Sequence, residues 1–142
     1  MDGAAELAEL GRKLKGADKV IAKELRKALR DEVKPTIQDI RAYARAILPN
    51  RGGLADRVAA QKFGARTSFA AKGGAVKIVG AGMKSMKSID AGKLRHPVFG
   101  NRKVWVPQSV TPGFFTGPIE DDLPKIREGI QRAMDRTAEQ LT

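Results

Sequence analysis

The sequence contains no cysteine and only one histidine, His96, among its 142 residues. The absence of cysteine excludes disulfide bonds and cysteine-ligated zinc, and one histidine is too few for a transition-metal site held by protein ligands alone. No apolar run approaches the roughly 20 residues that span a bilayer, and the acidic start at residues 1–3 does not resemble a signal peptide. We therefore expect no cofactor, no membrane contact and synthesis in a cytoplasm.

Aromatic residues are also scarce, seven in all, and much of the apolar content is alanine. A chain of this length fits a single domain, residues 1–142, but its core must be thin and rich in helix. Thin cores can gain stability from neighbouring subunits. Within the domain we expect a helical region at 1–48, a strand and loop region at 50–117, and a C-terminal helix at 120–141.

Acidic residues are nearly missing from the middle of the chain. Residues 50–117 hold 12 Lys and Arg against two acids, Asp56 and Asp90, whereas residues 1–49 and 118–142 carry net charges of +3 and −2. The two ends therefore have the mixed charge of solvated helices. The middle, with a net charge of +10, is expected to attract a polyanion or an acidic protein surface.

Apolar residues recur at helical spacing over residues 7–48. The drift of this stripe from a strict heptad favours core packing over a coiled coil. Because Pro35 removes a helical hydrogen-bond donor, the pattern predicts two N-terminal helices with a break near Lys34. The second of these helices is expected to end at Pro49 and Asn50.

The helical spacing returns near the C-terminus, from Glu120 or Asp121 to Leu141. Its expected first turn holds Glu120, Asp121 and Asp122, whose negative charges suit the positive end of a helix dipole. Pro124 is tolerated if it also lies in that first turn. The sequence therefore predicts one long C-terminal helix.

Strand-like segments occupy residues 57–69, 75–79 and 103–107, and a glycine turn at 72–74 joins the first two. Residues 80–88 have little apolar periodicity and predict a mobile loop. The loop residues that we single out are Gly80, Gly82, Met83, Lys84, Met86 and Lys87. Helix, helix, strands and helix in this order predict an α+β fold, with helices on one face of a small antiparallel sheet.

The sequence offers little for catalysis. His96 has no partner in a Ser-His-Asp or paired-carboxylate pattern, so we expect no enzyme activity and assign His96 to a turn or to packing on Phe99. The glycines at 73–74 and 80–82 lack the residues of a phosphate-binding loop. They are better interpreted as turns.

Sequence-independent DNA binding is an alternative, since several cations of the middle region could neutralise phosphates. These cations are Lys72, Lys77, Lys84, Lys87, Lys93, Arg95, Arg102 and Lys103. The sequence has no zinc finger, no aromatic stacking platform and no clear helix-turn-helix. Charge alone leaves this alternative open.

Four of the seven aromatic residues fall between positions 99 and 115, in a stretch rich in glycine and proline. Large rings in such turns form either a small core under a loop or the anchors of an interface. We therefore mark seven residues as candidate contacts with another subunit or a partner. They are Arg95, His96, Pro97, Phe99, Trp105, Phe114 and Phe115.

Three segments in this region resemble a known family. The segment IDAGKLRHPVFGNR at 89–102, with WVPQ at 105–108 and PGFF at 112–115, resembles the neck and tail-completion proteins of long-tailed bacteriophages, in their actinobacteriophage branch. The resemblance extends over about residues 50–140. It includes an opening at Arg51, Gly53 and Leu54, the box RHPVFG at 95–100, the box PGFF at 112–115 and the final helix.

The resemblance implies a virion protein without catalytic activity, assembled in the host cytoplasm, that forms a ring of commonly six copies. Such a ring ends the tail tube, as a tail terminator does, and docks on the head-tail connector or stopper proteins. A head-tail adaptor or stopper is the alternative within the same class. Tail tube protein and connector would be the partners, and DNA would pass through the ring without specific contact. Because a basic channel would retain DNA, we expect the basic middle to face neighbouring rings.

Overall fold

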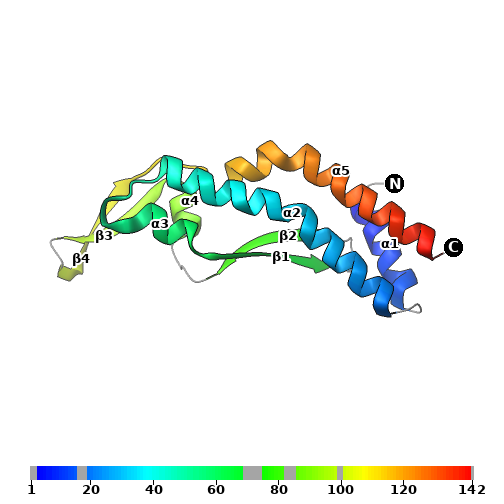
Figure 1. Ribbon diagram of the computed structural model, residues 1–142. Coiled ribbons are helices and arrows are strands. Elements are labelled where there is room, and N and C mark those ends of the chain that lie inside the picture. The colour runs from blue at the N-terminus through cyan, green and yellow to red at the C-terminus, as the bar shows by residue number, and fades with distance from the viewer. Residues whose placement is uncertain (1–2, 16–18, 69–74, 82–85, 99–100, 142) are drawn as a thin grey trace. The chain divides into compact units, whose positions relative to one another are not determined.

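The computed structural model describes residues 3–15, 19–68, 75–81, 86–98 and 101–141 (Figure 1). The elements along the chain are α1 (Gly3–Lys15), α2 (Lys19–Ile47), the 3-10 turn η1 (Arg51–Gly53), α3 (Leu54–Ala59), β1 (Lys62–Ser68), β2 (Ala75–Ala81), α4 (Met86–Asp90), β3 (Lys93–Val98), β4 (Asn101–Ser109) and α5 (Thr116–Gln140). Strand β1 pairs with β2, and β3 pairs with β4. The predicted α+β class is confirmed, with two small sheets instead of one.

The chain divides into two compact units, each built from segments that are distant in the sequence. Unit 1 comprises Met1–Pro35, Phe63–Val79 and Asp122–Thr142, and unit 2 comprises Thr36–Lys62 and Gly80–Asp121. Helices α2 and α5 therefore contribute residues to both units.

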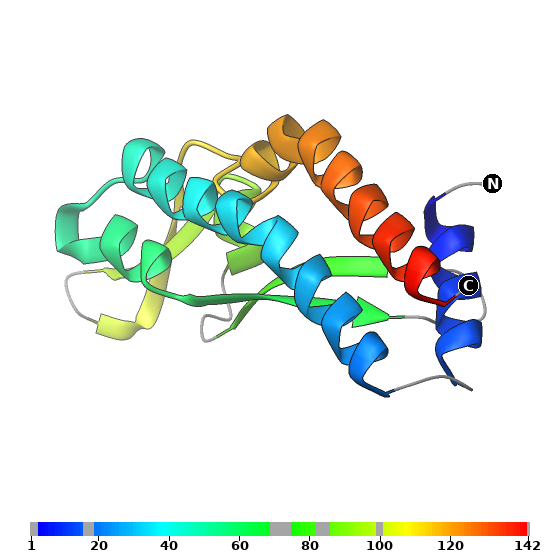
Figure 2. The ribbon, with the colours of Figure 1, turned by 45° about the vertical axis from the view of Figure 1, so that its right-hand side comes forward.

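The core of unit 1 is made where α1, the first half of α2 and the last half of α5 meet. Figure 2 shows α1 beside the C-terminal part of α5. The buried residues of this core are Leu7, Leu10, Leu14, Leu25, Leu29, Ala133 and Met134, and Val76 of β2 packs against them. All three helices present these residues at helical spacing, as the sequence predicts. Leucine provides five of the seven buried side chains of this core.

Unit 2 has its own set of buried residues. Helix α2 contributes Ile37, Ile40, Ala44 and Leu48, α3 contributes Leu54, Ala55, Val58 and Ala59, and two further buried residues are Ile89 and Phe114. Phe114 is the largest fully buried side chain among the described residues. Its ring therefore anchors this interior.

The predicted helix break near Lys34 is wrong. Helix α2 runs without interruption from Lys19 to Ile47, with Pro35 inside it. Proline in a helix interior costs about 3 kcal/mol, but Val33, Thr36 and Ile37 on either side are at most 7% exposed. Burying side chains such as these contributes roughly 1.5–3 kcal/mol for each large apolar one. Tertiary packing therefore keeps the helix continuous, and the first helix ends earlier, at Lys15.

The start of the predicted strand at 57–69 is also wrong, because residues 54–59 form α3 and β1 begins only at Lys62. Two glycines with positive φ, Gly52 at 76° and Gly53 at 83°, turn the chain into this helix. Four of its six residues are buried at helical spacing. The segment is too short for its own pattern to predict its conformation, and packing against neighbouring elements determines that it is helical.

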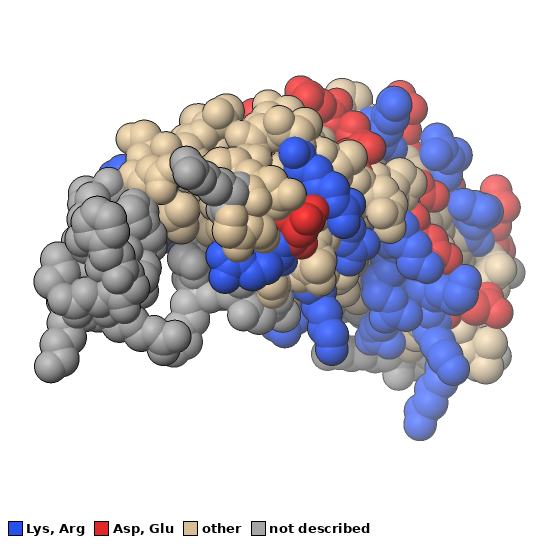
Figure 3. Space-filling model, turned by 60° about the vertical axis from the view of Figure 1, so that its left-hand side comes forward, with Lys and Arg blue, Asp and Glu red and all other residues tan. Residues whose placement is uncertain are grey.

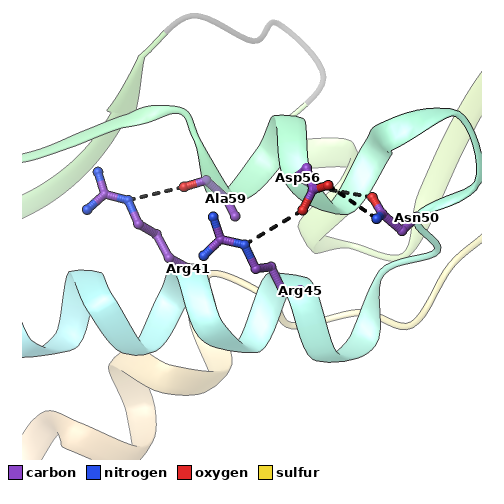
Figure 4. Close-up of polar contacts among 5 residues, drawn as sticks. All are labelled: Arg41, Arg45, Asn50, Asp56 and Ala59. Atoms are coloured by element: carbon purple, nitrogen blue, oxygen red, sulfur yellow. Dashed lines mark hydrogen bonds and ion pairs between the residues drawn. The ribbon is translucent and has the colours of Figure 1, made fainter.

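Polar contacts from α2 hold α3 in place within unit 2 (Figure 4). Arg41 Nε donates to the carbonyl oxygen of Ala59 at 3.1 Å, at the C-terminal end of α3. Asn50 Nδ2 donates to Asp56 Oδ2 at 3.2 Å, and Arg45 Nε lies 3.7 Å from Asp56 Oδ1. The guanidinium of Arg41 satisfies a carbonyl that the short helix leaves unpaired and suits the negative end of its dipole.

The predicted mobile loop at 80–88 is corrected at both ends. Gly80 belongs to β2, while Met86 and Lys87 belong to α4, whose Ile89 is fully buried. Gly82, Met83 and Lys84 lie outside the described residues, as does the predicted turn at 72–74. Ile89 supplies the anchor that the pattern of 80–88 alone did not reveal.

The strand expected at 103–107 is confirmed and extends over β4, Asn101–Ser109. Its antiparallel partner β3 was missed, because the proline at 97 argues against a strand. No helix of the described chain is long and apolar enough to cross a membrane.

Candidate assembly surface

The segment at 89–102 and the PGFF box at 112–115 meet at Asp90, the last residue of α4. The Gly113 amide donates to the Asp90 carbonyl oxygen at 2.8 Å. The amides of Phe115 and Thr116 donate to Asp90 Oδ1 at 2.8 and 3.0 Å. The Asp90 carboxylate therefore accepts hydrogen bonds from the last residue of the PGFF box and from the first residue of α5.

Asp90 corrects the prediction for the C-terminal helix. Helix α5 begins at Thr116, so its first turn contains no acidic residue, and Glu120 and Pro124 lie farther inside. The first amides of any helix lack intrahelical acceptors and favour a negative charge. Here Asp90 provides that charge from 26 residues away, and the sequence pattern around α5 gave no sign of it.

Glycine is required where the two segments approach each other. Gly92 has φ of 88°, and Gly113 has φ of 94°. The Val110 amide donates to the Gly92 carbonyl oxygen at 2.9 Å. A Cβ on Gly92 would lie 3.0 Å from the Val110 carbonyl oxygen and 3.3 Å from Pro112 Cβ. Both the positive φ and the close approach therefore disfavour a side chain at Gly92.

The β3–β4 hairpin follows directly from this joint, and its register is irregular near the turn. The Cα partners are Lys93↔Ser109, Leu94↔Gln108, Arg95↔Pro107, His96↔Val106, Pro97↔Trp105 and Val98↔Asn101, with a shift between Pro97 and Val98. Because the Val110 amide bonds to Gly92, the alternation of antiparallel pairs makes the Leu94 and His96 pairs the hydrogen-bonded ones. The Arg95 and Pro97 pairs are then not hydrogen-bonded.

Each outer edge of this hairpin carries a proline. In pairs that are not hydrogen-bonded, the backbone amides point away from the partner strand, and Pro97 on β3 and Pro107 on β4 have no amide hydrogen to present there. Proline at an edge opposes the addition of a further strand. The described sheet has two strands, and contact by side chains is favoured over extension by strand pairing.

The structure brings some of the predicted contact residues together. Pro97 lies across from Trp105, and Arg95 and His96 are the preceding positions of β3. The side chains of these four residues, and Phe99 as a whole, lie outside the part of the chain that the structure describes. The backbone register alone shows that Arg95, His96, Pro97 and Trp105 belong to one hairpin.

Phe114 is corrected from a contact residue to a core residue. Its side chain is fully buried, and its ring meets the ring of Phe115 edge to face with centroids 6.3 Å apart. Phe115 itself is half-buried. The rings in this stretch were expected to form either a small core or an interface anchor, and Phe114 belongs to a core.

Tyr43 is an exposed ring that the sequence reasoning missed. It is 40% exposed on α2, and a Cβ built on Gly117 of α5 would lie 3.4 Å from its Cε2 atom. Its neighbours Ile40 and Ala44 are buried, so Tyr43 lies at the edge of the buried face of α2. This position could have been recognised in the sequence, and aromatic rings are frequent anchors of interfaces.

A shallow groove of about 580 Å³ lies between the end of α2 and the end of β4, in the same unit. It is lined by Ile47, Leu48, Pro49, Gln108, Ser109, Val110 and Thr111. The groove combines apolar residues from the helix with polar ones from the strand. Such a mixture is typical of contacts between proteins.

The cations of the middle region are distributed over both units. Lys77 of β2, Lys87 of α4 and Lys93 of β3 are exposed. Among the described residues, no group of three His, Asp or Glu side chains is placed to hold a metal ion. The two acids of the middle region serve as hydrogen-bond acceptors in the fold, Asp56 for α3 and Asp90 for α5.

Searches against protein-family models, curated proteins and solved structures find no match to this chain.

Proposed function

We propose that this chain is a structural protein of the neck of a long-tailed bacteriophage, where copies of it form a ring that ends the tail tube and joins the tail to the head. The observation that carries the proposal is the joint at Asp90. It links the segment at 89–102 to the PGFF box and the start of α5 by three backbone amides. Two of the segments that carry the resemblance therefore belong to one structural joint, which supports the resemblance.

A closed ring requires two different surfaces on each copy, because its contacts are heterologous. The β3–β4 hairpin, with Trp105 and the prolines at its edges, provides one surface. The groove at the end of α2 and β4 is the candidate for the other. Edge prolines favour closure, since strand pairing without an end would produce filaments.

Rings of this kind have the tail tube protein and the head-tail connector or stopper as their partners. Six copies is the expected number, and DNA passes through the centre. Each of the two units has a small core, which fits a protomer that gains stability from its neighbours. A head-tail adaptor or stopper remains the second candidate of the same class, and binding to purified tail tubes separates the two.

Assembly can be tested at Tyr43, an exposed ring on α2, and at Trp105, which the hairpin register places across from Pro97. Tyr43→Ala and Trp105→Ala should raise the protomer concentration needed for assembly by tenfold or more, because interface anchors contribute about 2 kcal/mol. Val20→Ala is the matched control, since Val20 is 57% exposed on the same helix in unit 1. Sedimentation velocity measures assembly and circular dichroism measures helicity, which should not change.

Phe114→Ala should behave differently, because the ring is buried. It should lower the free energy of unfolding by about 3–5 kcal/mol and reduce assembly only as a consequence. A protein that stays monomeric at high concentration and is absent from purified virions would contradict the proposed function.

A further inference from the structure

The first half of α2 carries a dense set of exposed cations that the net charge of the N-terminal region conceals. Six Lys and Arg side chains are exposed in unit 1 on this helix, and we call them the α2 stripe. They are Lys19, Lys23, Arg26, Lys27, Arg30 and Lys34. Figure 3 shows Lys and Arg side chains gathered on one face of the molecule.

The α2 stripe occupies a single side of the helix. With 3.6 residues per turn, its six positions fall within an arc of about 100°. Glu24 lies about 60° beyond the edge of that arc, and Asp31 lies about 40° beyond it. The helix therefore separates its charges by face, although its sequence mixes them.

Asp31 removes little of this charge. Its Oδ2 lies 3.0 Å from Lys27 Nζ and its Oδ1 lies 2.8 Å from Lys34 Nζ, so one carboxylate is shared by two cations. The two lysine side chains remain about 70% exposed. The stripe keeps a net charge of about +5.

The rest of the helix fixes the stripe in position. The side of α2 next to the stripe is buried in unit 1 through Leu25, Leu29 and Val33, each at most 1% exposed. The next cations on the same side, Arg41 and Arg45, bond to α3 in unit 2. The stripe therefore ends before Arg41, because Arg41 and Arg45 bond within the protein, whereas the six earlier cations are exposed together to solvent.

The composition of the stripe indicates the chemistry of its partner. It contains no aromatic or apolar residue, whereas protein interfaces depend on such anchors at their centre, and single-stranded nucleic acid requires rings for stacking. An amphipathic membrane helix would need its apolar side, which is occupied by the core. A charged row without anchors fits a partner that is recognised by charge alone.

The length of the stripe fits duplex DNA. From Lys19 to Lys34 the helix rises about 22 Å, at 1.5 Å per residue. Over about 22 Å of axis a duplex carries about 13 phosphates on its two strands, at one per 1.7 Å. Because the strands wind around the axis, only the phosphates on the near side face a straight helix, and their number is comparable with the six cations of the stripe.

We propose that the α2 stripe binds the phosphate backbone of duplex DNA without regard to base sequence. Each protomer neutralises about five phosphates, so the logarithm of the binding constant falls with the logarithm of salt concentration with a slope of about −4.5. The binding of the stripe to DNA does not depend on whether the chain forms a ring.

The test is the double variant K23Q/R30Q, with K125Q/R132Q as the matched control. Both pairs are exposed on long helices in unit 1 and remove the same charge, and glutamine keeps a similar helix propensity. Fluorescence anisotropy with a random-sequence 25-base-pair duplex from 50 to 300 mM salt measures binding. K23Q/R30Q should reduce the slope by about 1.8 and weaken binding about 60-fold at 0.1 M salt, while the control keeps the wild-type slope.

Three outcomes would overturn the proposal. Equal losses in the two double variants would show that net charge, not the stripe, governs binding. Equal affinity for poly-glutamate and duplex at the same salt would indicate an acidic protein partner. Tighter binding to anionic vesicles than to duplex would indicate a lipid surface. If K23Q/R30Q does not fold by circular dichroism, the variant K19Q/K27Q tests the same stripe with the same expected change.

Discussion

Replacing Asp90 by alanine should destabilise the protein more than the loss of any exposed carboxylate. The side chain accepts hydrogen bonds from the amides of Phe115 and Thr116 at 2.8 and 3.0 Å, and from the Thr116 hydroxyl at 3.4 Å. Loss of a helix cap costs about 0.5–2 kcal/mol, and hydrogen bonds to a charged group contribute about 1.5–3 kcal/mol. These contributions overlap, so we expect Asp90→Ala to lower the free energy of unfolding by about 2–3 kcal/mol.

Asp90→Asn should have a smaller effect, about 1 kcal/mol, because the amide keeps an oxygen acceptor but loses the charge at the helix end. The control is Asp56→Ala, which removes the other acid of the basic middle. Its carboxylate is 66% exposed in its contact with Arg45, and exposed pairs contribute about 0–1 kcal/mol.

Urea unfolding measures the stability of these variants, and hydrogen exchange of the Phe115 and Thr116 amides measures the local effect. Both amides should exchange faster in Asp90→Ala than in the control. Equal losses of stability for Asp90→Ala and Asp56→Ala, with unchanged exchange, would refute the assignment of Asp90 as the cap of α5.

Two further predictions concern α2. Pro35→Ala should raise the free energy of unfolding by about 1–3 kcal/mol, because alanine restores a hydrogen-bond donor where the helix is already continuous. Urea unfolding measures this change. A lower urea midpoint in the variant would show that the proline is required. The pKa of Asp31 is lowered from 3.8, first by the hydrogen bond from Lys34 and then by the one from Lys27. The ionised Asp31 carboxylate therefore stabilises the fold above about pH 4, and this contribution is lost as the pH falls through the lowered pKa. An NMR titration of the Asp31 carboxyl in the wild type and in Lys34→Gln measures the pKa. The substitution should raise the pKa of Asp31 toward 3.8.

The charge of the chain illustrates the difference between sequence segments and surfaces. Counting by segment assigns the positive charge to residues 50–117. The structure shows a concentrated row of cations on α2, in a segment with a net charge of only +3. Of the eight acids that lower that net charge, four lie outside α2. On α2, Glu24 lies on another side of the helix and Asp31 is shared between two lysines, so the row remains positive.

The sequence by itself determined the long helical segments and many of the residues that they bury, but not the short helices α3 and α4. Leucine, isoleucine and alanine at helical spacing predicted most of α1, α2 and α5 and their inward sides, because amphipathic spacing acts locally and survives in the fold. The same reasoning predicted β4 and the α+β class. It also identified the two segments that meet in the structure.

Tertiary structure alone decided the features that depend on contacts between distant segments. Packing on both sides of Pro35 kept α2 continuous against the local preference of proline, and Asp90 moved the start of α5 to Thr116 from 26 residues away. Phe114 became a core residue, whereas Tyr43, which no motif marked, remained exposed. In each case a local conformational preference of about 1–3 kcal/mol competes with burial or hydrogen bonds of similar free energy that come from distant parts of the chain. A local sequence pattern contains the preference but not the distant contacts.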